Sequence, residues 1–324
     1  MDSGSGEKRR QPLLVLTGPT AVGKTKLSIA LAHALSGEII SADSMQVYRG
    51  MDIGTDKIRP EDMDGVPHHL IDVLDPTDDF HVYAFQKMAL HKIDEIASRG
   101  NLPILVGGTG FYIQAVLYQV DFTDSEDGGA YRKELEERVV REGEDAVRAL
   151  HEELRAVDPE AAEAIHAHNV KRVIRALEFH HLTGERISDH NASQRVKESP
   201  FDFLCFVLTD DRAKLYERIN RRVDEMIAGG LEGEVRGLFA AGLTGDEVSM
   251  QGLGYRQMAA YLHGSCSFDE AVTAIKTETR HFAKRQITWF KRERDVRWLD
   301  RREFKDDGAI LEEMLKQCKT AWKI

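Results

Sequence analysis

The residues with the clearest chemical potential form a glycine-rich segment near the start of the chain. The sequence GPTAVGKT matches the phosphate-loop pattern GxxxxGK[ST] in full and directly follows the apolar run LLVLT. Glycines let backbone N–H groups surround phosphate oxygens, and the amino end of a following helix adds partial positive charge. We therefore predict a di- or triphosphate site formed by Gly18, Pro19, Thr20, Ala21, Val22, Gly23, Lys24 and Thr25.

Within this segment, two side chains have distinct expected roles. The Lys24 ammonium can reach the terminal phosphates, and the Thr25 hydroxyl can bind Mg²⁺. The motif is shared by nucleotide-binding proteins, ATP-binding ones included, and does not by itself select the phosphate compound. A strand–helix turn without any ligand would not explain the Lys-Thr pair.

Polar residues also follow two other apolar runs. Asp43 comes after 38–42, and Thr109 lies in the glycine-rich turn after 103–107. In an open parallel sheet the carboxyl ends of the strands line the ligand crevice, so Asp43 would stand where a general base or metal ligand acts. The alternatives are a turn-forming or helix-capping Asp43 and a glycine-rich turn that serves packing alone.

These residues need a layered scaffold to bring them together. Continuous apolar runs favour strands buried on both faces of a parallel sheet, at 13–17, 38–42, 70–74, 103–107 and 203–208. Helical patterns occur between and after them, at 24–35, 81–98, 211–240 and 268–294. The fold class is therefore α/β. The stretch 124–190 has helical spacing and no strand pattern, which predicts a helical insertion.

The charge balance of the chain argues at first against nucleic acid. The formal net charge is −11, whereas nucleic-acid binders usually carry excess positive charge. However, 280–302 contains nine Lys/Arg and only three acids, interleaved with aromatics, and 171–177 has a basic helical face. This pattern suits a phosphate-backbone surface with stacking partners, although a solvated basic face is the plainer interpretation for either helix alone.

Several classes of protein are disfavoured. The three cysteines form no CxxC pair, which argues against a disulfide framework or a thiolate zinc site and fits the cytoplasm. No apolar run approaches the roughly 18 residues of a membrane span. A small-molecule or nucleotide kinase remains an alternative, with Asp72 as the nearest approach to a Walker-B acid. A GTPase-like switch would need a guanine-reading NKxD motif, which we do not find.

Seven motifs together resemble one known family, the tRNA dimethylallyltransferases, also called isopentenyl-tRNA transferases. They run in order from about residue 13 to 298: GPTAVGKT, ISADSMQVYRGMDIGTDK, VPHHLIDVLDP, LPILVGGTGFYIQAVL, NVKRVIRALE, GLGYRQM and KRQITWFKR. The resemblance implies a P-loop kinase-like parallel sheet core, flanked by helices, with an insertion that embraces the anticodon stem. It divides the chain into a core of 11–122 and 200–305 and an insertion of 123–199. The polar start of the chain predicts a disordered tail of 1–10.

The resemblance also implies a reaction. Such enzymes transfer a dimethylallyl group from dimethylallyl diphosphate to N6 of the adenine on the 3′ side of the anticodon, releasing diphosphate with the help of Mg²⁺. By match to the family, Asp43 is the general base, Lys24 binds diphosphate, and Thr109 lies near the reacting centre. Arg212 and Arg218 resemble family arginines near the diphosphate, with Arg222 as a further neighbour; their alternative is a solvated amphipathic helix.

The same match predicts the contacts with tRNA. They are Asp43, Ser44, Met45, Gln46, Arg132, Lys171, Arg172, Arg175, Gln251, Gly254, Tyr255, Arg256, Lys284, Arg285, Gln286, Trp289 and Lys291. Lys171 replaces the glutamine usual there, and the stretch FTDSEDGGAYRKELEE is acidic and lacks the family's prolines. The eukaryotic zinc finger is missing, so no zinc is expected. The expected partners are the tRNA anticodon stem-loop and the prenyl donor, with no membrane and a monomeric enzyme.

Overall fold

The chain divides into two compact units in a computed structural model that describes residues 10–122 and 128–323. The core unit comprises Met1–Gln119 and Pro200–Ile324, and the insertion unit comprises Val120–Ser199. The expected disordered tail lies outside the described residues, except for Arg10. In the part of the chain that the structure describes, no helix is long and apolar enough to cross a membrane.

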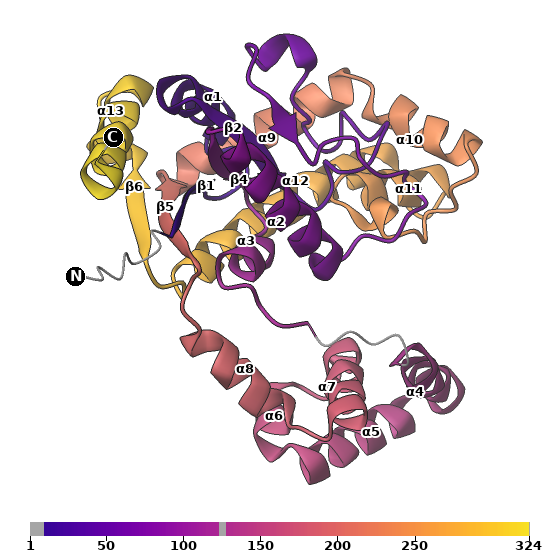
Figure 1. The fold of residues 1–324 in the computed structure, drawn as a ribbon. Helices are drawn as coiled ribbons and strands as arrows, with labels where there is room; N and C mark the ends of the chain where they lie inside the picture. The colour runs from indigo at the N-terminus through magenta and orange to yellow at the C-terminus, as the bar shows by residue number, and fades with distance from the viewer. Residues whose placement is uncertain (1–9, 123–127, 324) are drawn as a thin grey trace, which may run out of the picture. The chain divides into compact units, whose positions relative to one another are not determined.

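The core unit is built on a six-stranded parallel sheet with the order β3-β2-β4-β1-β5-β6. Figure 1 labels β2, β4, β1, β5 and β6 of this sheet. The strands are β1 Gln11–Thr17, β2 Gly37–Ala42, β3 His68–His69, β4 Leu102–Gly107, β5 Phe201–Thr209 and β6 Val296–Asp300. The central strand β1 pairs with β4 and β5, with Leu14 in register with Ile104 and Leu204. The predicted α/β class is therefore confirmed.

Both faces of the sheet are covered, which explains the continuous apolar runs. Successive residues of β1 point to opposite sides, so Leu13 and Val15 join one apolar cluster while Leu14 and Leu16 join the other. The first cluster includes α2 Val82–Ser98 and α3 Gly110–Leu117, and the second includes α1 Lys24–Leu35 and α13 Asp307–Trp322. Helix α12, Phe268–Phe290, contributes to both clusters.

The predicted strand at 70–74 is wrong. The pairing residues are instead His68 and His69, which lie beside Ile39 and Ile40 of β2. Leu70 and Asp72 adopt positive φ values of 61° and 55°, which break an extended run. The following backbone N–H groups of Val73 and Leu74 donate to the carbonyl of Val47, so this run braces a loop rather than extending the sheet.

The core also continues past residue 305, where the prediction ended it. Helix α13 buries Ile310, Met314, Cys318 and Trp322 against the second cluster. Their spacing of four residues forms one apolar stripe, which is the pattern of a helix packed on a sheet.

The remaining helices fall into two groups. The core unit contains α9 Arg212–Ala228, α10 Leu231–Ala240 and α11 Tyr255–Leu262. The insertion unit contains α4 Gly128–Glu142, α5 Glu144–Val157, α6 Pro159–Ala164, α7 Val170–Thr183 and α8 Ile187–Val196. The described residues of the insertion unit include no strand, and an apolar cluster of their own, with Leu150, Leu154 and Ile174, holds these helices together.

Candidate active site

The predicted chemical residues gather where the parallel strands end. The phosphate loop 18–25 follows β1, Asp43 follows β2, and Thr109 lies just after β4. These three strands are neighbours in the sheet, and Thr17 Oγ1 donates a 2.8 Å hydrogen bond to the carbonyl of Gly107. The residues therefore lie at the carboxyl edge of the sheet, where open α/β sheets bind ligands.

The glycines of the phosphate loop are required by geometry. Gly18 has a φ of +139°, and a Cβ there would lie 2.4 Å from the carbonyl oxygen of Leu208. Gly23 has a φ of +93° and precedes α1 at its amino end. Only residues without a side chain fit such positions easily, so the loop can wrap its backbone around a small anion.

Lys24 is held against the same loop. Its ammonium donates to the carbonyls of Gly18 and Pro19 at 3.0 and 2.9 Å. Burial lowers the pKa of Lys24 to about 8, and the nearby charge of Arg222 acts in the same direction, while Asp43 and Asp56 oppose both. Lys24 is therefore a cation near neutral pH, placed where a phosphate group would exchange for two carbonyl acceptors.

Asp43 has the features of a proton acceptor. Burial raises the pKa of this carboxyl above its usual value, while the N–H groups of Met45 and Gln46 and the charge of Lys24 oppose the rise. Its Oδ1 accepts a 2.9 Å hydrogen bond from the Met45 N–H, so the turn-forming role that the sequence left open is also observed. A carboxyl with a raised pKa is a stronger base than an ordinary surface aspartate.

Thr109 precedes α3 and is only partly buried. The next residue, Gly110, supports the Trp289 indole so closely that a Cβ there would lie 2.2 Å from the ring. Trp289 also meets Phe111 edge to ring, at a centroid distance of 6.1 Å. The predicted RNA residue Trp289 thus forms a wall beside Thr109.

Gln286 joins the two glycine-rich loops. Its Oε1 accepts from the Thr20 N–H and its Nε2 donates to the Gly108 carbonyl, both at 2.9 Å. The side chain is only 6% exposed. The predicted contact of Gln286 with RNA does not fit this position, because both ends of its amide already bond the core.

Three arginines surround the outside of the phosphate loop. Arg218 Nε donates to the Ala21 carbonyl at 2.9 Å, and Arg301 Nη1 donates to the Val22 carbonyl at 3.2 Å. Arg222 Nη1 reaches Thr20 Oγ1 at 3.5 Å. Sequence reasoning placed Arg218 here, left Arg222 open and missed Arg301, which only the return of the chain through β6 brings to the loop.

Arg212 differs from these arginines. It donates to the Tyr216 hydroxyl at 3.0 Å and lies over the same ring at 5.1 Å from its centroid. Its side chain is exposed at the start of α9. These contacts do not bring Arg212 to the phosphate loop, so the alternative of a solvated helix face describes it better than the predicted diphosphate contact.

Side-chain hydrogen bonds of Gln46 stabilise the segment that begins at Asp43. Gln46 accepts a hydrogen bond from Ser41 Oγ at 3.0 Å and donates one to the Thr55 carbonyl at 3.2 Å. Met45 packs against Gly252, where a Cβ would lie 2.6 Å from the methionine Cε. Ser44, Met45 and Gln46 directly follow Asp43 in the chain and are all partly buried.

The motif GLGYRQM divides between core and surface. Tyr255 is 0% exposed and its hydroxyl lies 2.5 Å from Glu234, while Gly254 is also buried. Their predicted contacts with RNA do not fit these positions. Arg256 is exposed and pairs with Glu278. Gln251 is exposed and donates to the Gly245 carbonyl at 2.9 Å.

The outer side of α12 carries a different kind of charge. Lys284 and Arg285 of this helix are exposed, as are Lys291 and Arg292 just after it, and no carboxylate of the described residues lies within ion-pair distance of these four. All but Lys291 line an open hollow of about 440 Å³, together with His281, Thr288 and Trp289. Unneutralised cations beside an aromatic ring are suited to a nucleic-acid backbone.

The insertion unit uses its arginines in another way. Glu178 is 1% exposed, and both Arg132 and Arg175 bind its carboxylate, at 2.6 and 2.9 Å. Lys171 and Arg172 lie exposed on the same helix, α7. The predicted RNA residues of this unit therefore include two that hold a buried carboxylate. The acidic stretch before Arg132 lies partly outside the described residues.

A metal ion would depend on few protein groups. Among the described residues, no group of three or more His, Cys, Asp or Glu side chains could hold one. Thr25 lies exposed in the first turn of α1, beside the phosphate loop. Mg²⁺ commonly takes one or two protein ligands and completes its shell with substrate phosphates and water, so the Thr25 hydroxyl fits the predicted role.

Fold and site together define a parallel α/β protein with a phosphate loop and a basic helix face. The model of the IPP transferase family matches residues 46–293, and that of isopentenyl transferase matches 11–73. The chain belongs to the IPP transferase family, which confirms the resemblance seen in its motifs.

Individual relatives agree. The chain is 57% identical to the tRNA dimethylallyltransferase of Lachnoclostridium phytofermentans, over 94% of this chain and 97% of that one. The solved structure of the tRNA isopentenylpyrophosphate transferase of Bacillus halodurans matches with a TM-score of 0.73 and 45% identity, covering 97% of both chains. A eukaryotic dimethylallyltransferase acting on tRNA matches with a TM-score of 0.77 and 30% identity, covering 90% of this chain and 74% of that one.

Proposed function

We propose that this enzyme transfers a dimethylallyl group from dimethylallyl diphosphate to N6 of the adenine on the 3′ side of the tRNA anticodon, releasing diphosphate. The observation that carries the proposal is the placement of Asp43 after β2 and of Lys24 after β1, at the carboxyl edge of the same parallel sheet. One residue is suited to accept a proton and the other to bind a departing phosphate group. The names of the relatives supply the two substrates.

The chemistry asks for these two residue types. An adenine amine is a weak nucleophile because its lone pair is delocalised into the ring, whereas an allylic carbon reacts readily as its leaving group departs. The N6 electron pair forms the new bond to the allylic C1, and the electrons of the C1–O bond leave with diphosphate. Asp43 accepts the N6 proton.

The departing diphosphate gains negative charge, which fixed cations and N–H groups stabilise. The backbone of 18–25 and the Lys24 ammonium supply them in this chain. When bound through Thr25, Mg²⁺ would neutralise further charge on the diphosphate oxygens. Thr109 and the Trp289 wall would border the reacting carbon and help to exclude water from it.

The tRNA would dock on cations of both units. Lys284 and Arg285 of α12 and Lys291, just after it, are the strongest candidates, because they have no acid partner among the described residues. Lys171 and Arg172 of α7 are candidates in the insertion unit. We expect a monomer that works in the cytoplasm, without a membrane partner.

A single incubation separates this proposal from the kinase alternative. The enzyme is given tRNA lacking the modification, with either dimethylallyl diphosphate or ATP, and the nucleosides are analysed by mass spectrometry. We expect N6-dimethylallyladenosine in the first reaction and no phosphoryl transfer in the second. Phosphoryl transfer from ATP without any prenylated adenosine would contradict the proposal.

A further inference from the structure

A second carboxylate lies beside the phosphate loop, at the far end of the segment that starts with Asp43. Asp56 Oδ2 lies 2.8 Å from Arg222 Nη1, the same nitrogen that reaches Thr20 Oγ1. Thr20 belongs to the phosphate loop and is tied to Gln286 through its N–H. A continuous polar path therefore runs from Asp56 through Arg222 to the loop that would hold the diphosphate.

The backbone at Asp56 is unusual. Its φ is +51°, in the left-handed region that residues with side chains rarely occupy. Its N–H donates to the Ile53 carbonyl at 3.1 Å, and its own carbonyl accepts from Gln46 Nε2 at 3.4 Å. Such a conformation persists when the surroundings determine it, and it often accompanies a functional site.

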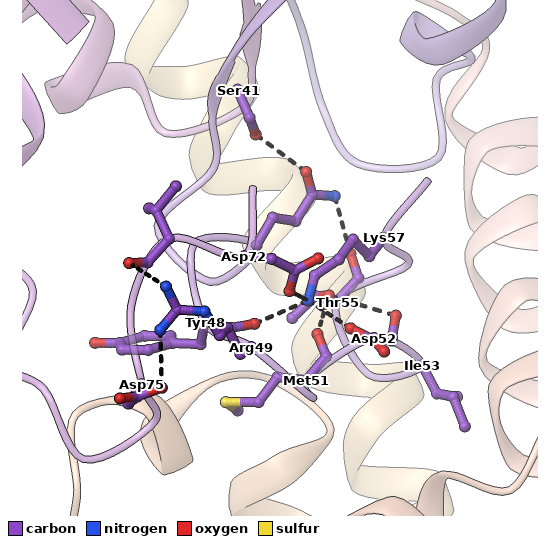
Figure 2. Close-up of polar contacts among 12 residues, drawn as sticks. Ser41, Tyr48, Arg49, Met51, Asp52, Ile53, Thr55, Lys57, Asp72 and Asp75 are labelled. Carbon is purple, nitrogen blue, oxygen red and sulfur yellow. Dashed lines mark hydrogen bonds and ion pairs between the residues drawn. The ribbon is translucent and has the colours of Figure 1, made fainter. Parts of the chain in front are cut away.

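The contacts of Lys57 help to hold the backbone at Asp56 in this conformation. Its side chain is only 4% exposed and its ammonium meets three acceptors: the Tyr48 carbonyl at 2.8 Å, Asp52 Oδ1 at 2.5 Å and Asp72 Oδ1 at 2.6 Å (Figure 2). An ammonium has three donors, so this buried charge is fully satisfied. The residue next to Asp56 is thereby fixed to two other parts of the chain.

Glu234 of α10 fixes the same segment from the other side. Its carboxylate accepts from the N–H groups of Asp52, Ile53 and Gly54, at 2.9, 2.8 and 3.1 Å. Three backbone bonds to one charged acceptor leave 52–54 little freedom. The direction in which Asp56 points is thus set by the fold and not by a mobile surface loop.

The chemistry of arginine gives this arrangement a use. A guanidinium carries five N–H donors in a rigid plane that suits phosphate oxygens, but a long side chain loses rotamer freedom when it binds. A carboxylate on Nη1 orients the group in advance. We propose that Asp56 is a positioning residue that holds Arg222 over the phosphate loop, so that its guanidinium is oriented for the donor's diphosphate.

This inference rests on the proposed function for the identity of the ligand, and it competes with a simpler electrostatic view. Asp56 is negative, so a role through charge alone would repel diphosphate, and its removal would then strengthen binding. Pre-orientation of Arg222 gives the opposite sign. The affinity for inorganic diphosphate therefore distinguishes the two.

The test is a double-mutant cycle read by calorimetry with inorganic diphosphate and Mg²⁺. Asp56→Asn removes the charge, and asparagine tolerates the left-handed backbone. We expect it to weaken diphosphate binding and raise the KM for the donor about tenfold. In the Arg222→Gln background the same change should have almost no effect. Unchanged or tighter binding by Asp56→Asn, or an equal loss in both backgrounds, would overturn the proposal.

Two more variants complete the test. Asp56→Glu keeps the charge but moves the carboxylate by one methylene, so positioning predicts a loss and a charge effect predicts none; it also decides the matter if Asp56→Asn does not fold. Asp64→Asn is the matched control. Asp64 has a φ of +50°, is 77% exposed and pairs with His33, so its replacement should leave diphosphate affinity unchanged.

Failure of the proposed function would look different. Diphosphate affinity is measured without transfer, and transfer by the wild-type enzyme is measured separately on tRNA. If the two substitutions are coupled in diphosphate affinity but no prenylated adenosine forms, the proposed function fails and the Asp56–Arg222 pairing stands. Normal transfer, combined with additive effects of the Asp56 and Arg222 substitutions on diphosphate affinity, would leave the proposed function and remove the Asp56–Arg222 pairing.

Discussion

Around the phosphate loop, Arg218, Arg222 and Arg301 each pair with a carboxylate, whereas the outer cations of α12 have none within ion-pair distance among the described residues. The first arrangement fixes each guanidinium before a ligand arrives, which is what stabilisation of a developing charge requires. The second leaves long cationic side chains without an acid partner, which suits a polyanion held through many weak contacts. Positive charge alone therefore does not identify the task of a surface.

The largest expected effect is on the rate of transfer, and it concerns Asp43 beside the phosphate loop. Asp43→Asn keeps an acceptor for the Met45 N–H but removes the base, so transfer should fall at least about a hundredfold. The affinity for tRNA should change little, because binding depends on the other region. Single-turnover transfer and filter binding measure the two quantities. A comparable loss of tRNA affinity would show that Asp43 is a binding residue.

The next largest effect concerns the unpaired cations on the outer side of α12. Lys284→Ala combined with Arg285→Ala should weaken tRNA binding about tenfold or more and reduce the salt slope by about 2, because two phosphate contacts are lost. The KM for dimethylallyl diphosphate should stay unchanged. Lys316→Ala with Lys319→Ala on α13 removes the same charge elsewhere and is the control. An unchanged salt slope would count against α12 as the RNA surface.

The third effect is a dependence on pH. The pKa of Lys24 is lowered to about 8, so its positive charge is lost as the pH rises through that value. We expect kcat/KM for the donor to fall about tenfold per pH unit well above 8, since the donor's phosphates are fully ionised there. Folding stability has the opposite sign: the unfolded lysine still binds a proton between pH 8 and 10.5, so stability rises over that window.

A variant isolates this dependence on pH. Lys24→Arg keeps a positive charge at all these pH values, so its activity, whatever its size, should lose the alkaline limb. The pH profile of kcat/KM measures the difference. A limb that survives in Lys24→Arg would belong to another group.

The smallest effect compares residues within α7. Lys171→Ala should weaken tRNA binding a few-fold, as expected for one exposed phosphate contact. Arg175→Ala should mainly lower stability, by about 2 kcal/mol, because it leaves Glu178 buried with one cation fewer. Binding titrations and thermal unfolding separate the two. A larger loss of tRNA affinity from Arg175→Ala than from Lys171→Ala would show that Arg175 contacts the RNA and does not serve mainly to pair with Glu178.

The parts of the structure that depend on residues close together in sequence could be predicted. The phosphate loop, its helix and the strand before Asp43 depend on neighbours in sequence, and continuous apolar runs identified the parallel core. The run 70–74 misled because hydrophobicity does not reveal positive φ values at Leu70 and Asp72. Tyr255 and Gln286 looked like surface residues of polar motifs, yet their partners, Glu234 and the glycine-rich loops, lie far away in sequence.

Arg222 and Arg301 show the same limit at the site itself. One residue in a helix of many arginines meets Asp56, and the other reaches the Val22 carbonyl from beyond the last strand. Neither spacing nor composition marks them. Only the sheet order, with β5 beside β1 and β6 beside β5, places both next to the phosphate loop.

Gln286 has a mechanical consequence. It lies between Arg285, on the outer side of α12, and the two loops that its amide connects, and adjacent helical residues point about 100° apart. A rotation of α12 that followed an RNA backbone would strain both of its hydrogen bonds at once. Gln286 therefore makes the position of α12 and the conformation of the two glycine-rich loops depend on each other.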